Sequence, residues 1–200
     1  VEETQHIVDC GFLQAARDLV MLGKRLPKVQ LKPLRRELFW AMSNVAAGNA
    51  AQVTAVMELG DDFLQLIVSS ARWDQYVVRM EALWLLSNLL LHSDSSQRQK
   101  LVMLDGVLPL CEFLADPREA HVQQNILETI DKLLFDPMHG ASYKLLVEEN
   151  MGLDYIANTA VSGKNQQHVE ICCRILSTHF DNTEDPDLAP DESNEVERGL

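Results

Sequence analysis

The sequence has few basic residues, no paired-cysteine motif and no long apolar run. Its 200 residues include 17 Lys and Arg against 30 Asp and Glu, which gives a formal net charge of −13. Nucleic-acid binding requires clustered Lys and Arg to neutralise phosphates, so this balance argues against that function. It favours a basic partner, because opposite electric fields speed encounter. No run of about 18 apolar residues occurs, as a membrane-spanning helix would require.

The side chains that usually carry catalysis or bind metal are not grouped into known motifs. The four cysteines, Cys10, Cys111, Cys172 and Cys173, lack Cys-x-x-Cys spacing and are predicted to be small apolar fillers of a reduced, intracellular protein. His168 precedes the last two of them but lacks the further ligands of a zinc site. Neither a phosphate-binding loop nor a Gly-x-Ser-x-Gly motif appears. We therefore expect no metal, no cofactor and no enzymatic activity.

The acidic charge is concentrated at the end of the chain. Residues 181–200 carry eight acids and one base, a net charge of −7, together with Pro186 and Pro190 and few apolar residues. Such a composition cannot bury enough apolar surface to fold. The preceding residues carry the remaining −6, and 46% hydrophobic residues overall suffice for a packed core. We predict two parts: an ordered array over residues 1–180 and a disordered acidic tail over residues 181–200.

Two sequence phrases recur at regular distances. The glycines that end the first phrase, Gly11, Gly60, Gly106 and Gly152, are separated by 49, 46 and 46 residues. In the second phrase, residues 37–44 (Glu-Leu-Phe-Trp-Ala-Met-Ser-Asn) match residues 81–88 (Glu-Ala-Leu-Trp-Leu-Leu-Ser-Asn) at Glu, Trp, Ser and Asn. A period of about 40–47 residues in a helical chain is typical of armadillo or HEAT repeats.

Apolar spacing and the helix breakers divide the chain into short helices. Helices are predicted at residues 2–10, 12–22, 33–46, 49–59, 61–70, 74–91, 95–105, 106–115, 118–135, 141–150, 152–161 and 165–180. The predicted fold is an all-α, armadillo-repeat, right-handed superhelical solenoid of nearly four three-helix repeats. The glycine between the first two helices of a repeat is expected to permit a positive φ and close backbone approach. The basic segment 23–36 is predicted to be a loop between helices.

Residues three and four apart share one face of a helix, so the second phrase predicts two matching stripes. The first stripe contains Glu37, Trp40, Ser43 and Asn44, and the second contains Glu81, Trp84, Ser87 and Asn88. An Asn side chain can hold both the N–H and the C=O of an extended peptide. Trp rings can wall the stem of a Lys or Arg, whose charge would meet the glutamate. This pattern predicts binding of an extended, Lys/Arg-rich peptide. The alternative is packing, with Trp in the core and Asn satisfying buried backbone groups.

Longer motifs surround both stripes. They are Glu-Thr-Gln-x-x-Val-Asp-x-Gly at 3–11, Trp-x-Met-Ser-Asn-x-x-Ala-Gly-Asn at 40–49, Glu-Ala-x-Trp-x-x-Ser-Asn at 81–88, Gly-Val-Leu-Pro-Leu-Cys at 106–111 and Glu-Glu-Asn-Met-Gly-Leu-Asp-Tyr-Ile at 148–156. In this order, across residues 1–185, they resemble the C-terminal armadillo repeats of the importin alpha family, adaptors that carry nuclear-localisation-signal cargo into the nucleus. Because Val1 is not Met and helical pattern begins at once, we expect a piece of a longer protein.

The resemblance implies the minor cargo site of that family. Trp40, Asn44, Trp84 and Asn88 fall on its Trp/Asn array, and Glu37 and Glu81 match the acids beside the ligand's basic side chains. Ser43 matches a residue that flanks the array, Ser87 is its counterpart in the second stripe, and Thr4 falls where the preceding repeat lines a lysine pocket. The implied partners are basic nuclear-localisation-signal peptides, importin beta through a segment outside this sequence, and an export receptor and a nuclear-pore protein at the last repeats. The implied location is the cytoplasm and nucleus, between which the adaptor shuttles.

The sequence also departs from the family pattern. Gly11 precedes Trp40 by 29 residues, whereas Gly60 precedes Trp84 by only 24, which indicates an insertion in the basic segment. Glu128 and Lys132 replace the Trp/Asn pair in the next repeat, so the groove is predicted to end before it. The alternative function is a scaffold that docks folded transport receptors through its last repeats and tail, with a degenerate groove. A junction or signalling armadillo protein is disfavoured, because those usually present Lys and Arg in the groove.

Overall fold

The computed structural model describes residues 2–22, 28–115 and 120–180. In order, they form α1 (Glu2–Asp9), α2 (Phe12–Leu22), α3 (Lys28–Ala46), α4 (Ala50–Met57), α5 (Asp61–Trp73), α6 (Tyr76–His92), α7 (Ser95–Met103), α8 (Leu108–Leu114), α9 (Ala120–Leu134), α10 (Gly140–Glu149), α11 (Gly152–Ser162), α12 (Gln166–Ile175) and a π-helical turn, η2 (Leu176–Phe180). These ranges contain no strand, and the helices lie close to their predicted positions except at the start of α3. The predicted acidic tail, residues 181–200, lies outside the described residues.

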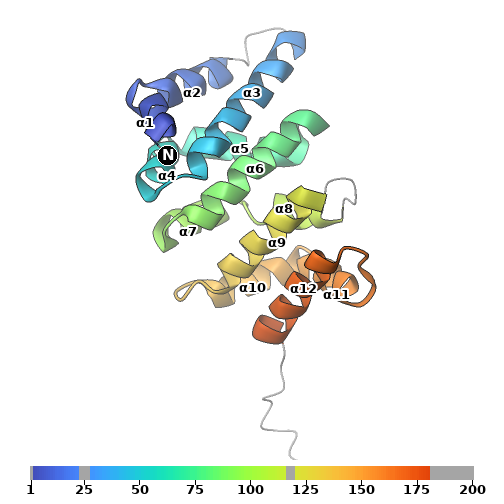
Figure 1. Cartoon of the computed structure of the whole chain (residues 1–200). Helices are drawn as coiled ribbons and strands as arrows, with labels where there is room; N and C mark the ends of the chain where they lie inside the picture. Colours follow the sequence, from blue (N-terminus) through green and yellow to red (C-terminus); the bar gives the residue numbers. More distant parts are fainter. Residues whose placement is uncertain (1, 23–27, 116–119, 181–200) are drawn as a thin grey trace, which may run out of the picture.

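The helices stack in consecutive groups of three, and the third helices form a continuous row. In that row, α3 packs against α6, α6 against α9, and α9 against α12. Within a group, α5 covers α6, α8 covers α9 and α11 covers α12. Figure 1 shows the groups succeeding one another along the stack, from blue at α1 to red at α12. The predicted all-α solenoid is therefore confirmed, and each group depends on its neighbours for burial.

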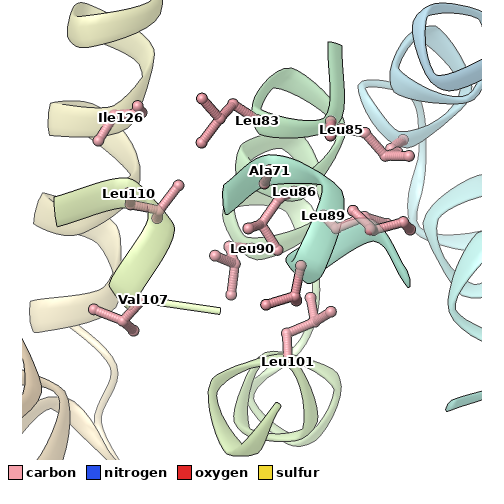
Figure 2. Packing of buried hydrophobic residues seen from close by; sticks show 14 of the residues in the cluster. Ala71, Leu83, Leu85, Leu86, Leu89, Leu90, Leu101, Val107, Leu110 and Ile126 are labelled. Carbon is pink, nitrogen blue, oxygen red and sulfur yellow. The ribbon is translucent and has the colours of Figure 1, made fainter. Parts of the chain in front are cut away.

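The central helix α6 is buried on two opposite sides. Leu83, Leu85, Leu86, Leu89 and Leu90 are all completely buried. Figure 2 shows Leu85 directed toward the ribbon of the preceding group, while Leu83 is directed toward Ile126 of α9. A helix covered on both sides must be apolar around most of its circumference, as the sequence predicts for this segment.

Matching polar caps begin the first helix of two successive groups. The Asn49 side chain accepts from the Gln52 backbone N–H, while the Gln52 side chain accepts from the Asn49 backbone N–H. Asp94 and Gln97 form the same reciprocal box at α7. Gln97 also donates from Nε2 to Thr54 Oγ1 at 2.9 Å, which joins α7 to α4. The caps satisfy backbone N–H groups that a helix start leaves free, and they fix where each repeat begins.

The repeated glycines serve two different purposes. Gly11 and Gly60 adopt positive φ values of 79° and 107°, as predicted. In the next two groups the prediction is wrong, because the preceding residues, Asp105 and Met151, take the positive φ instead. There the glycine provides space: a Cβ on Gly106 would lie 2.7 Å from the Leu101 carbonyl oxygen. A Cβ on Gly152 would lie 2.8 Å from Cys111 Sγ. The close approach of backbones predicted at these turns is therefore present.

The predicted loop over residues 23–36 is wrong for its second half. Helix α3 begins at Lys28 and contains Pro33; residues 23–27 lie outside the described residues. Pro33 lies in the second turn of α3, so its missing N–H costs one intrahelical hydrogen bond. The Arg35 guanidinium also bonds the Asp74 carboxylate at 2.6 Å, which holds this end of α3 against the junction of α5 and α6.

Arginine–carboxylate pairs join successive groups along the stack. They are Arg17–Asp62 at 2.8 Å, Arg35–Asp74 at 2.6 Å, Arg72–Glu112 at 2.8 Å, Arg98–Asp136 at 2.5 Å and Arg174–Asp131 at 2.9 Å. In each pair the partners are about one repeat apart in sequence. Guanidinium groups suit this task because they can bond a carboxylate with two N–H groups at once.

Candidate functional site

Two tryptophans lie one repeat apart on the third helices α3 and α6. Trp40 is 54% exposed, although it follows the fully buried Phe39, and Trp84 is half-buried. One turn to either side of Trp40 the exposed residues are Glu37 and Asn44. Their counterparts on α6, Glu81 and Asn88, are half-buried beside Trp84. We call these six residues the Trp face: Glu37, Trp40, Asn44, Glu81, Trp84 and Asn88.

The two serines assigned to the stripes do not belong to the Trp face. Ser43 is 5% exposed and Ser87 is completely buried. The Ser43 hydroxyl donates to the Trp40 carbonyl oxygen at 2.8 Å, within the same helix. A ligand cannot reach either hydroxyl from outside, so the expectation that Ser43 and Ser87 contact a peptide is corrected. Their small size instead allows α3 and α6 to pack closely beneath the exposed residues.

Asn88 connects the two helices of the Trp face. Its Nδ2 donates to the backbone carbonyl oxygen of Ser43 at 3.0 Å. This bond uses one of the two N–H groups of the side chain and fixes the orientation of the carboxamide. The bond also fixes the register of α6 against α3. These two helices pack directly against each other, although the sequence between Gly11 and Trp40 is longer than that between Gly60 and Trp84.

A cleft of about 640 Å³ opens beside Trp84, between α6 and the start of α9. We call it the α6–α9 cleft; its lining residues are Arg36 from α3, Tyr76, Val77, Met80, Glu81 and Trp84 from α6, and His121 and Val122 from α9. The spacing of the two stripes predicts Glu81 and Trp84 at the site but not the other lining residues. Met80 and Val77 lie four and seven residues before Trp84, on the same helix face. That spacing is the signal that could have found them.

The charged groups at the cleft influence one another. The Arg36 guanidinium donates to the Glu37 carboxylate, and both side chains are about half exposed. Burial raises the pKa of Glu81, the attraction of Arg36 lowers it, and the repulsion of Glu37 raises it further. The pKa of Glu81 is therefore above its ordinary value, which marks a carboxylate that lacks a fully compensating cation. Partly buried acids of this kind are typical of binding sites.

The remaining predicted positions lie around this centre. Thr4 is half-buried on α1, which packs against α3 and α4, and it does not line the α6–α9 cleft. On α9, Glu128 accepts a hydrogen bond from Gln124 at 3.1 Å, and Lys132 is exposed. These two side chains occupy the helix positions that Trp84 and Asn88 occupy on α6, one turn apart. The aromatic and amide pattern of the Trp face does not continue at these positions.

The cysteines and histidines have packing roles or lie at the surface. Cys111 and Cys172 are buried, and burial raises the pKa of each thiol to about 12. Cys10 and Cys173 are exposed, so the prediction that all four fill the core is wrong for these two. His168 is buried and its Nε2 lies 3.0 Å from the Ala120 carbonyl oxygen. The described residues hold no cluster of three or more potential metal ligands.

None of the helices in the described ranges combines the length and the apolar character needed to span a membrane.

The Trp face and the cleft offer complementary features to one kind of ligand. Indole faces attract cations and pack against aliphatic stems, and two carboxylates lie one turn away on the same helices. The Asn44 amide is exposed, and the half-buried Asn88 amide donates only one of its two N–H groups to Ser43, so both can bond main-chain N–H and C=O groups of any sequence. The arrangement is therefore suited to an extended polypeptide with long, positively charged side chains.

Comparison with known proteins gives sequence relatives of one kind. Importin subunit alpha-5 from Arabidopsis thaliana is 28% identical over 175 residues, which cover 84% of this chain and 33% of that protein. Probable importin subunit alpha-A from Dictyostelium discoideum is 34% identical over 141 residues, which cover 64% of this chain and 24% of that protein. This chain thus spans about a third or less of the curated relatives it matches. No protein-family model matches it.

Solved structures with the same fold include designed armadillo repeat proteins. A designed armadillo repeat protein in complex with the peptide (KR)4 superposes with a TM-score of 0.70 at 22% identity, covering 88% of this chain and 67% of that one. A second one, designed for modular peptide recognition, has a TM-score of 0.69 at 19% identity, covering 86% of this chain and 66% of that one. The chain has the armadillo-repeat fold, and its sequence is similar to importin alpha subunits over most of its length.

Proposed function

We propose that this chain binds extended Lys/Arg-rich peptides along the Trp face, as part of a nuclear import adaptor. The single observation that carries the proposal is the position of Trp84, which belongs to the Trp face and also lines the 640 Å³ cleft that contains Glu81. The proposal is supported by the relatives named importin subunit alpha. It is also supported by the designed armadillo repeat protein of the same fold, whose structure is a complex with the peptide (KR)4.

In the proposed mechanism, three kinds of side chain contact different parts of the peptide. Trp40 and Trp84 pack against the aliphatic stems of successive basic residues, with about 0.5 to 2 kcal/mol from each cation–π contact. Glu37 and Glu81 meet the charged ends of those side chains. Asn44 and Asn88 bond the peptide main chain, which makes recognition independent of the residues between the basic ones. Binding therefore requires an extended ligand rather than a helical one.

The proposal is one of binding rather than catalysis. By similarity to its relatives, the chain would act in transport between cytoplasm and nucleus, with nuclear-localisation-signal peptides of cargo proteins as its ligands. The last repeats, which end with the group α10 to α12, and residues 181–200 are the proposed docking region for folded transport receptors. If peptide binding fails in the test below while receptors still bind, the scaffold function is the correct one.

Isothermal titration calorimetry with a peptide carrying a Lys-Lys-Arg-Lys core tests the site. We expect Trp40→Ala and Trp84→Ala each to weaken binding about tenfold or more, because each removes a wall and a cation–π partner. Trp73→Ala is the matched control, since Trp73 is 73% exposed on α5 and does not line the cleft. It should change the affinity less than twofold.

Trp40→Ala shows whether weaker binding by Trp84→Ala results from loss of a peptide contact or from misfolding of the variant. Trp84 is half-buried and packs against the core, whereas Trp40 is mostly exposed. Equal affinities for wild type, Trp40→Ala and Trp73→Ala would show that the peptide binds elsewhere and would remove the basis of the proposal. So would the absence of binding to the wild-type chain at high micromolar peptide concentration.

A further inference from the structure

Arg36 places a cation of the chain itself at the proposed ligand site. It lies on α3, one turn before Trp40, and lines the α6–α9 cleft together with Glu81 and Trp84 of the neighbouring helix. Its guanidinium bonds the Glu37 carboxylate through Nε at 3.0 Å and through Nη2. Its charge also attracts Glu81, the second carboxylate of the Trp face. Glu37 and Glu81, the two carboxylates proposed to bind a ligand's cation, therefore already interact with the positive charge of Arg36.

The contacts of Arg36 differ from those of the other arginines in the described ranges. Arg17, Arg35, Arg72, Arg98 and Arg174 each pair with a carboxylate about one repeat away and so hold the stack together. Arg79 bonds the Ala71 carbonyl oxygen and lies over the Phe113 ring. The ion-pair partner of Arg36 is Glu37, its own neighbour in sequence on the same helix. Moving its guanidinium aside therefore breaks its hydrogen bonds to Glu37 within α3, and between repeats it loses only the attraction of Arg36 for Glu81.

We propose that Arg36 is an internal competitor that occupies the acidic part of the site and must be displaced by the basic side chain of a ligand. This inference rests on the proposed function. A cation on a short side chain has an effective concentration in the millimolar range at its own site, whereas a peptide is present at micromolar concentration. A ligand with one weakly bound Lys loses that competition. A ligand with two adjacent basic residues engages Glu37 and Glu81 together and displaces Arg36. Arg36 therefore determines how strongly the site prefers such a ligand over one with a single Lys.

Arg36→Gln tests the competition, because Gln keeps the helix propensity and much of the length but lacks the charge. Two peptides of equal length are titrated by fluorescence anisotropy, one with a single Lys and one with a Lys-Arg pair in the same Ser/Ala host. We expect Arg36→Gln to tighten binding of the pair about three- to fivefold, the strength of a partly exposed charge contact. The single-Lys peptide should gain more than the pair, because it competes with Arg36 for the acidic part of the site with only one charge. Lys164→Gln, at an exposed position between α11 and α12, makes the same change in net charge and should alter binding less than twofold.

A second measurement needs no ligand. Arg36 lowers the pKa of Glu81, so Arg36→Gln should raise that pKa further, as followed by NMR titration of the Glu81 carboxyl, while Lys164→Gln should leave it unchanged. An unchanged Glu81 pKa in Arg36→Gln would overturn the proposal.

The peptide titration separates failure of this inference from failure of the proposed function. Equal effects of Arg36→Gln and Lys164→Gln on a binding reaction that Trp84→Ala weakens would overturn the competition alone. Weaker binding by Arg36→Gln would overturn it too, by showing that Arg36 contacts the peptide favourably. Binding of neither peptide to wild type or Arg36→Gln would overturn both proposals.

Discussion

Glu81 is a residue whose charge lowers the stability of the free protein. Because burial raises its pKa, the folded chain binds the carboxyl proton more tightly than the unfolded chain does. Ionised Glu81 therefore destabilises the fold, fully at pH values above its folded-state pKa and not at all below its unfolded-state pKa. We expect Glu81→Gln to raise Tm at pH 7, with a gain that disappears as the pH is lowered through these two pKa values.

Thermal unfolding followed by circular dichroism at several pH values checks this expectation. The same variant should bind basic peptides more weakly, so stability and binding change in opposite directions. Glu58→Gln, at the exposed residue that caps the C-terminal end of α4, controls for the change in net charge. A Tm gain for Glu81→Gln that persists at acidic pH, or a loss at pH 7, would contradict the assignment.

For individual residues, the sequence predicts only part of the two stripes correctly. Spacing of three and four residues correctly brings Glu37, Trp40 and Asn44 to one exposed face. It fails for Ser43 and Ser87, because a residue beside the stripe faces solvent or the next helix depending on how closely the helices pack. The Asn88 bond to the Ser43 carbonyl shows that α6 lies against this side of α3. Such packing is a property of two helices and is absent from the spacing within one.

Among the elements, the junction between α6–α7 and α9–α10 is held by a buried ion pair. Arg98 Nε and Nη2 bond the carbonyl oxygens of Leu90 and Ser93, and Nη1 bonds Asp136 Oδ2 at 2.5 Å. Asp136 Oδ1 also accepts from Ser95 Oγ at 2.9 Å. Both charged side chains are nearly inaccessible to solvent. Removal of one partner would leave the other charge buried and unpaired.

Asp136→Asn tests this junction. We expect a loss of about 3 kcal/mol or more in the free energy of unfolding, measured by urea denaturation at pH 7, because the Arg98 charge loses its counterion. Burial alone would raise the pKa of Asp136, but the bonds from Ser95, from two backbone N–H groups and from Arg98 outweigh it and lower the pKa. Its contribution is therefore present above the unfolded-state pKa and is lost as the pH falls through the folded-state pKa.

An exposed ion pair supplies the control for Asp136→Asn. Asp62→Asn removes the partner of Arg17 at the surface, where solvent screens the interaction, and should cost much less than Asp136→Asn. Similar losses for the two variants would show that the buried pair has no special role at the junction.

The start of α3 shows why the element boundaries are not fully predictable. Pro33 and the cluster of basic residues before it are typical of a loop, yet the helix already begins at Lys28. The Arg35–Asp74 bond that anchors this end reaches across 39 residues of sequence. Local signals suffice for the starts of α4 and α7, because the capping pairs Asn49–Gln52 and Asp94–Gln97 each lie within four residues of sequence.

At the scale of the whole molecule, stability should be graded along the stack. α6 packs against a third helix on each side, α3 and α9, whereas α1 and α2 lie at one end of the described stack and α12 at the other. Native-state hydrogen exchange should therefore be slowest in α6 and faster in α2 and α12. Uniform exchange rates across these three helices would indicate a single cooperative unit instead.

The sequence predicts the architecture better than the site. The period of 44 to 49 residues suffices for the order of the helices and the stacking of α3, α6 and α9, because each group buries itself against the next. The α6–α9 cleft was not predictable, since it depends on how three helices from three groups lie relative to one another. His121 of α9 and Arg36 of α3 are 85 positions apart and share no motif.

The hydrogen bond from Asn88 to Ser43 joins residues that are 45 positions apart, so the site repeats with the period of the helix groups. Insertion of a few residues between these positions would disturb the bonds that cross from one group to the next. Duplication of a whole group, such as residues 49–93, would reproduce one capping box, one Trp/Asn pair and one inter-helix bond together. Adaptation to longer or shorter ligands is therefore expected to proceed by gain or loss of entire modules, with point mutations left to adjust the fit within each.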